Sequence, residues 1–149
     1  MSLEQAGLAA QVIASGMMCG VIWFVQLVHY PQLGDVPGEA GREYARRNRQ
    51  RTAWVVLPPM IVEAVAAVWC AVWPPAGVAP ALTYVGLGLV VAAWLSTLLV
   101  QMPLHERLGR EGSRPDLVGR LVASNWLRTL LWTGRALLAT WMLTVAGRF

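Results

Sequence analysis

The sequence predicts an all-α fold, a four-helix transmembrane bundle made of two parallel two-helix repeats. Three observations support this prediction: an apolar composition, four apolar segments of membrane-spanning length, and two motifs that recur in the same order. Of the 149 residues, 56% are hydrophobic and 13% are charged, whereas about 25% of the residues in a soluble globular domain are charged. Because so few charges cannot cover a globule in water, the lipid bilayer is the expected solvent and partner.

Four segments have the roughly 20 mostly apolar residues that a helix needs to cross the hydrocarbon core. They cover residues 8–28, 53–73, 81–102 and 126–145 of a single domain, 1–149. Pro58 and Pro59 are expected to kink or loosen the start of the second segment. The first segment is longer than the core of a typical signal peptide and follows no basic residue, so we expect it to be retained.

The first and third connections between these segments carry most of the positive charge. The chain has no lysine, and its connecting arginines are Arg42, Arg46, Arg47, Arg49 and Arg51 in the first connection, and Arg107, Arg110, Arg114 and Arg120 in the third. The positive-inside rule then places loops 1 and 3 in the cytoplasm and both termini outside, in a bacterial-type inner (plasma) membrane. Topology thus explains the net charge of +4, and no nucleic-acid partner is expected.

The two halves of the chain share two motifs. QLVHYPQLG at residues 26–34 corresponds to QMPLHERLG at 101–109, and N-x-x-R-T occurs at 48–52 and again at 125–129. The offsets are 75 and 77 residues, so the motifs keep their order and spacing. Copies with two helices each run parallel, related by an axis along the membrane normal. The predicted repeats cover about residues 8–73 and 81–145.

Each apolar segment presents its polar residues along one face at helical spacing. Polar groups in lipid are costly and normally face the bundle interior, so these faces are expected to point inward. The stripes are Gln11, Ser15, Met18, Ile22, Gln26 and His29; Asn48, Arg51, Val55, Pro59 and Glu63; Thr97, Gln101 and His105; and Asn125, Arg128, Trp132, Arg135, Ala139 and Met142. At a helical rise of 1.5 Å, Glu63 lies about 18 Å beyond Arg51, and Arg135 about 10 Å beyond Arg128. We therefore predict that Glu63 and Arg135 pair inside the membrane.

Small residues mark two further helix faces, with the four-residue spacing that lets backbones approach closely. They are Gly16 and Gly20 in the first segment, and Gly88, Ala92 and Ser96 in the third. We expect these faces to pack helices within the bundle, with homodimerisation as the alternative. Cys19 and Cys70 lie inside apolar segments and are interpreted as small core residues without a disulfide.

The two histidines, His29 and His105, end the odd-numbered helices at equivalent places in the repeats. One interpretation is an acid/base pair for proton transfer, and a second is a pair of ligands to a transition metal or a haem iron. In the third interpretation each histidine only caps its helix end or faces head-group water. The sequence therefore leaves the cofactor unknown.

Arg51 and Arg128 are the arginines of the two N-x-x-R-T motifs. Arginine at the cytoplasmic end of a span is a common interfacial anchor. Its repetition favours a shared role in holding an anionic or carbonyl-bearing substrate. The predicted substrate-binding set is Asn48, Arg51, Asn125, Arg128, Gln26 and Gln101, with Glu63 and Arg135 in support.

Short motifs at the helix ends add a family resemblance. Pro31 follows the first segment, and Trp126 and Arg128 begin the fourth. In these features the chain resembles the anthrone-oxygenase-like family of small four-helix integral membrane proteins, across most of its length. That family has Pro-x-Asn where this chain has Pro103-Leu104-His105. The resemblance implies oxygenation of polycyclic aromatic substrates.

The leading functional hypothesis is a membrane-embedded, oxygenase-like oxidoreductase with His29 and His105 as its catalytic pair. Its substrate is expected to be a hydrophobic small molecule of aromatic or quinone-like type, bound in the cytoplasmic half of the bundle. The alternatives are a small non-catalytic subunit or binding protein of a larger membrane complex, and a dimeric transporter. The sequence contains no phosphate-binding loop and no nucleophile elbow.

Overall fold

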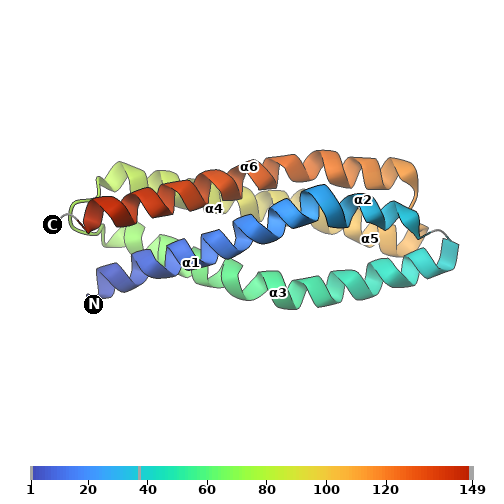
Figure 1. The fold of residues 1–149 in the computed structure, drawn as a ribbon, viewed down its shortest axis with the longest axis horizontal. Helices are drawn as coiled ribbons and strands as arrows, with labels where there is room; N and C mark the ends of the chain where they lie inside the picture. Colours follow the sequence, from blue (N-terminus) through green and yellow to red (C-terminus); the bar gives the residue numbers. More distant parts are fainter. Residues whose placement is uncertain (1, 37, 148–149) are drawn as a thin grey trace.

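The computed structural model describes residues 2–36 and 38–147, which are almost entirely helical and contain no strand. The elements in chain order are α1 (Leu3–Phe24), η1 (Val25–His29), α2 (Tyr30–Gln32), η2 (Leu33–Asp35), α3 (Gly38–Val72), α4 (Pro80–Ser96), η3 (Thr97–Gln101), α5 (Met102–Glu111) and α6 (Pro115–Ala146). The short elements continue the long ones, so the described residues form four rods (Figure 1). These rods are α1–η2, α3, α4–α5 and α6.

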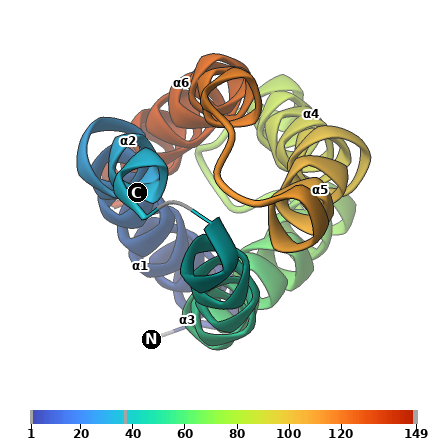
Figure 2. The same ribbon diagram turned by 90° about the vertical axis from the view of Figure 1, so that its right-hand side faces the viewer.

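The four rods form a ring, seen end-on in Figure 2, in the order α1, α3, α4–α5, α6. Successive rods run in opposite directions (Figure 1). The chain therefore enters and leaves at one end of the bundle, and the first and third connections both lie at the other end. We call this other end the basic end, because the arginines of both connections gather there.

Local sequence signals set several of the helix boundaries. α1 begins with a capping box, in which the Gln5 N–H donates to Ser2 Oγ (3.2 Å) and the Ser2 N–H donates to Gln5 Oε1 (3.0 Å). α4 and α6 begin with Pro80 and Pro115, at the position where proline needs no hydrogen-bond partner. α5 ends at Glu111, and the φ of +87° at the following Gly112 suits glycine and terminates the helix.

Three of the four rods are long and apolar enough to cross a membrane: Leu3–Asp35, Gly38–Val72 and Pro80–Glu111. Among the described residues α6 does not meet this criterion, so the prediction of four spans is supported for three. The reason is the polar content of α6, which includes Arg128 and Arg135. Both side chains are buried inside the bundle rather than on its outer surface.

The two basic connections were predicted at about residues 30–52 and 103–125, but they are mostly helix. α3 already begins at Gly38, and α6 begins at Pro115. Only residues 112–114 separate α5 from α6. Hydropathy marks the apolar part of a helix and misses its polar continuation, which is why the predicted segments were too short. α3 also runs through Pro58 and Pro59 without an interruption.

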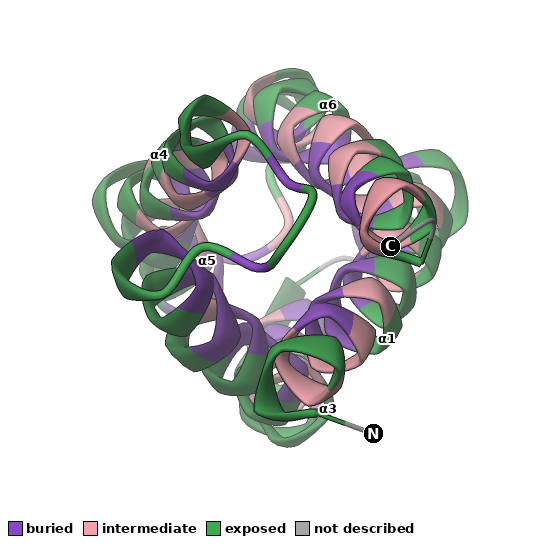
Figure 3. Ribbon diagram, turned by 90° about the vertical axis from the view of Figure 1, so that its left-hand side faces the viewer, coloured by how far each residue is buried: buried purple, intermediate pink, exposed green. Residues whose placement is uncertain are grey.

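Buried residues face the inside of the ring, and exposed residues face outward (Figure 3). The predicted inner stripe of α6 is confirmed, since all six of its members from Asn125 to Met142 are buried. The stripe of α1 is buried from Gln11 to Gln26, and His29 is half-buried. In α3 the prediction is wrong at Arg51 and Val55, which are exposed.

The inner face of α3 passes instead through Thr52 and Val56, which are half-buried. A helix has 3.6 residues per turn, so a stripe that leaves Asn48 can continue after three residues or after four. Both continuations reach Pro59 and Glu63, and the sequence pattern did not separate them. Packing against the neighbouring rods selects the four-residue step.

The expected packing role of the small residues is wrong for Gly16, Gly20 and Gly88. All three are exposed, and a Cβ atom at these positions would have no described atom within 4 Å. Gly86 has this role instead, since a Cβ atom there would lie 3.3 Å from Nη1 of Arg135. As expected for core cysteines, Cys70 is buried, Cys19 is half-buried, and neither forms a disulfide.

Candidate functional site

A cavity of about 450 Å³ lies inside the half of the bundle nearest the basic end. All four rods contribute to its walls, which are mainly apolar. The principal apolar lining residues are Met18, Ile22, Val25, Val56, Met60, Trp94, Leu98 and Met102. Three of the lining residues, Leu57, Leu98 and Met102, are 44%, 48% and 44% exposed. The cavity therefore reaches the outer surface between α3 and the η3–α5 segment, on the side where lipid is expected.

The polar groups of the cavity lie at the end nearest the basic connections. His105 and Tyr30 meet there, with 2.9 Å between His105 Nε2 and the Tyr30 hydroxyl oxygen. Their rings pack edge to face, with centroids 5.3 Å apart. Tyr30 is only 4% exposed, so this hydrogen bond is largely shielded from solvent. A buried imidazole–phenol pair can accept, hold and pass on a proton.

Tyr30 is the site residue that the sequence analysis missed. It follows His29 directly, at the fifth position of the first nine-residue motif, where the second motif has His105. The comparison of the two copies drew attention to the shared residues, namely glutamine, histidine and proline. The position of Tyr30 just after a predicted span was the sequence feature that could have indicated a polar role for its hydroxyl group.

Arg128 supplies the positive charge of the site. It is 5% exposed, lines the cavity, and donates from Nη1 to Asn125 Oδ1 at 3.0 Å. Its guanidinium carbon lies 5.1 Å from the centre of the Trp132 ring, a cation–π contact that fixes its orientation. Its Nε has no hydrogen-bond partner among the described residues. Since an unpaired buried donor is unfavourable, this N–H is suited to a ligand or a water molecule.

Two buried glutamines were predicted to be equivalent, but the structure gives them different partners. Gln26 is engaged at both ends: its Oε1 accepts from Asn125 Nδ2 (2.9 Å), and its Nε2 donates to the Val122 carbonyl (3.2 Å). Gln101 donates to Ser124 Oγ (2.9 Å), while its Oε1 has no partner in the described part of the chain. Gln101 lines the cavity and so offers it a free acceptor.

Each nine-residue motif begins at a π-helical turn. Gln26 and His29 lie in η1, and Gln101 is the last residue of η3. A π-helical turn inserts one extra residue into a helix and is frequent at functional sites. These turns change the direction of the following side chains, which include Tyr30 and His105.

The predicted pairing of Glu63 with Arg135 is confirmed. Arg135 Nε lies 3.4 Å from Glu63 Oε1, and each side chain is 1% exposed. Glu63 Oε2 accepts from Trp132 Nε1 (2.9 Å), and Arg135 donates to the amide oxygen of Gln11. This network does not line the cavity, but Trp132 connects it to Arg128.

Two members of the predicted site lie elsewhere. Arg51 is exposed and does not line the cavity, whereas Asn48 of the same motif does. His29 does not line it either, and its ring centre is 6.0 Å from that of Tyr30. His105 Nε2 is bonded to Tyr30, whereas His29 Nε2 has no hydrogen-bond partner among the described residues. In the described residues no three His, Cys, Asp or Glu side chains are grouped as metal ligands.

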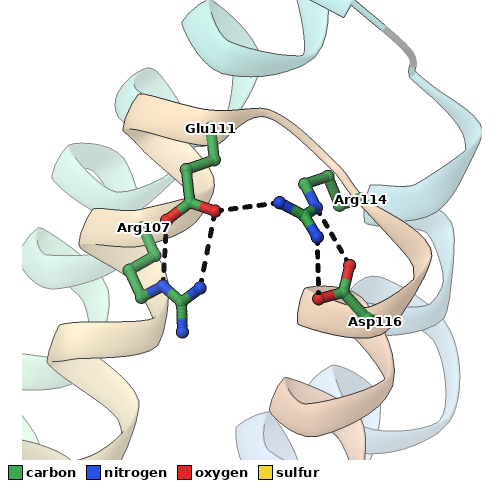
Figure 4. Close-up of polar contacts among 4 residues, drawn as sticks. All are labelled: Arg107, Glu111, Arg114 and Asp116. Atoms are coloured by element: carbon green, nitrogen blue, oxygen red, sulfur yellow. Dashed lines mark hydrogen bonds and ion pairs between the residues drawn. The ribbon is translucent and has the colours of Figure 1, made fainter.

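Ion pairs neutralise part of the basic end. At the α5–α6 turn, Glu111 accepts from both Arg107 (2.9 Å) and Arg114 (3.4 Å), and Arg114 also binds Asp116 (Figure 4). At Asp116 desolvation raises the pKa of the carboxyl group, but the hydrogen bonds and charge of Arg114, together with backbone N–H donors, lower it below the usual value. These arginines are therefore occupied on the surface and are separate from the cavity.

Comparison with family models, curated proteins and solved structures finds no significant match to this chain.

Proposed function

We propose that this chain is an integral membrane protein in which α6 also crosses the bilayer, with the basic end in the cytoplasm of a bacterial-type cell. α6 has 32 residues and packs along α1 and α4. Two of its three arginines, Arg128 and Arg135, face other rods rather than lipid, where a charge would be costly. In the ring, α1 lies opposite α4–α5 and α3 lies opposite α6. This arrangement supports a duplicated two-helix unit.

We further propose that the cavity binds a hydrophobic substrate of aromatic or quinone-like type, and that the protein is an oxygenase-like oxidoreductase. One observation carries this proposal: the apolar walls end at a hydrogen-bonded His105–Tyr30 pair beside the unpaired Nε of Arg128. Ligand sites are typically apolar pockets with a few convergent polar groups. The opening between α3 and the η3–α5 segment gives a lipid-dissolved molecule direct access.

The described residues supply proton transfer and charge stabilisation. A substrate oxygen bound to Arg128 Nε would be stabilised as it gains negative charge, because the guanidinium is already oriented and shielded from water. His105 would take the proton released from the substrate, and Tyr30 would hold the imidazole in position. The resulting electron-rich anion is the species that dioxygen, the expected oxidant, would oxidise.

Binding of a naphthoquinone to the purified protein in mild detergent tests this proposal, with quenching of tryptophan fluorescence as the measurement. Arg128→Gln is expected to weaken binding about tenfold, which corresponds to about 1.4 kcal/mol. Tyr30→Phe and His105→Ala should weaken it less and remove turnover. The matched controls are Arg51→Gln and His29→Ala, which alter the motif partners outside the cavity. Equal losses in the controls and in the site variants would contradict the assignment.

An absorption spectrum and metal analysis of the same samples address the cofactor. A haem band or a stoichiometric metal that disappears in His105→Ala would add a cofactor to this site. A protein that binds no aromatic probe and co-purifies with a partner would instead be a non-catalytic subunit. Substrate flux in liposomes without turnover would indicate a dimeric transporter.

A further inference from the structure

A second, smaller cavity adjoins the first at the basic end. It has a volume of about 260 Å³ and shares four lining residues with the large cavity: Arg49, Gln50, His105 and Glu106. Arg46 and Arg110 line only the smaller one. Because the two cavities share these walls, they lie side by side. His105 lies at the junction.

The smaller cavity has a formal excess of positive charge. Arg46, Arg49 and Arg110 contribute three charges and Glu106 removes one, which leaves two. Glu106 lies 3.7 Å from Arg49, so this pair is internally compensated. Arg46 and Arg110 form no ion pair with any described residue, unlike Arg107 and Arg114 at the nearby turn (Figure 4).

Arg46 is held in place by the backbone. Its Nε donates to the Gly109 carbonyl at 3.0 Å, and a Cβ atom at residue 109 would lie 3.2 Å from Cγ of Arg46. Glycine therefore lets the arginine stem approach α5 closely. The terminal nitrogens of Arg46 remain for an anion, which a guanidinium group binds with paired hydrogen bonds.

We infer that the two cavities hold one anionic amphiphile, with a carboxylate or phosphate group between Arg46 and Arg110 and an apolar ring or chain in the large cavity. This inference rests on the proposed function and narrows its substrate class. A charged head at the basic end would place the adjoining carbon atoms beside His105 and Arg128. An apolar tail would follow the walls toward the opening between α3 and η3–α5.

The test uses the full chain in phosphatidylcholine nanodiscs, with bound ligand counted by native mass spectrometry. The probes are dodecyl phosphate, dodecanol with the same chain, and inorganic phosphate alone. We expect dodecyl phosphate to bind at least tenfold more tightly than either fragment. The double variant Arg46→Gln/Arg110→Gln should remove that advantage. The control Arg51→Gln/Arg120→Gln, which removes the same charge outside both cavities, should keep it.

Three results would overturn the inference: no advantage of dodecyl phosphate over dodecanol, an equal loss in the control, or equally tight binding of inorganic phosphate. Naphthoquinone binding separates this failure from that of the proposed function, because it should persist in the Arg46→Gln/Arg110→Gln variant. Nanodiscs of phosphatidylglycerol identify the source of the head group. Competition by that lipid indicates a membrane lipid, and retained binding indicates a free amphiphile; both support an anionic amphiphile.

Discussion

α6 and α3 both contain the N-x-x-R-T motif, but its arginine is buried in α6 and exposed in α3. On α6, Arg128 is buried against Trp132 and bonded to Asn125. On α3, Arg51 is exposed, and Thr52 donates to Asn48 within the helix at 3.3 Å. Equal sequence spacing therefore led to unequal burial.

The difference lies in the partners that surround each arginine. A buried guanidinium is tolerated only where hydrogen-bond acceptors, a carboxylate or an aromatic face replace its water. Arg128 has such partners in Asn125 and Trp132, and Gln26 of η1 in turn accepts a hydrogen bond from Asn125. No comparable partner of Arg51 occurs among the described residues. An identical short motif therefore does not ensure an identical environment.

The largest expected effect is at the buried ion pair. Arg135→Met leaves Glu63 charged and unpaired inside the bundle, so we expect a loss of about 3–5 kcal/mol in the free energy of unfolding. The double variant Arg135→Met/Glu63→Met should recover much of that loss. Denaturation in mixed micelles measures both. If the double variant were no more stable than the single one, charge pairing would not explain why these two side chains are tolerated in the core.

The next largest effect is the difference in stability loss between the two motif arginines. Arg128→Gln leaves the Asn125 acceptor and the Trp132 ring without their cation, which should cost about 1–3 kcal/mol. Arg51→Gln removes an exposed charge and should change stability by less than about 0.5 kcal/mol. Equal losses measured in the same denaturation experiment would show that burial does not distinguish the two copies.

The asparagines sharpen the comparison at a smaller scale. Asn125 accepts from Arg128 and donates to Gln26, so Asn125→Ala should cost about 1–2 kcal/mol and weaken ligand binding through Arg128. Asn48→Ala removes one hydrogen bond within a helix and should have a much smaller effect on stability. An opposite order of the two losses would contradict the hydrogen-bond pattern described above.

The smallest effect is expected at two neighbouring glycines of α4. Gly86→Ala would place its methyl group against the Arg135 guanidinium and should destabilise the protein by about 1 kcal/mol. The methyl group added by Gly88→Ala would face open space, so this variant should be neutral or slightly more stable, because alanine favours the helix. A thermal-melting comparison of the two variants in one detergent is sufficient. Similar melting temperatures would mean that the Arg135 side chain moves aside for the new methyl group without a loss of stability.

Much of the inner surface followed from periodicity. The stripes of α1 and α6 and the contact between Glu63 and Arg135 were predictable, because a buried charge near the middle of a span needs a partner of opposite sign. The step from Asn48 to Thr52 was not predictable, since three-residue and four-residue steps fit the pattern equally well. Tyr30 was missed because its partner, His105, is 75 residues away in the sequence.

The sequence by itself determined that the chain is helical and apolar, where the apolar parts of its helices lie, and that most of its polar stripes turn inward, because these properties depend on composition and on local spacing. Only the tertiary structure decided which polar groups meet. The cavity, the His105–Tyr30 pair and the basic pocket each require side chains from different rods. Their contacts depend on the rotation and order of the rods in the ring, which long-range packing fixes and local sequence does not.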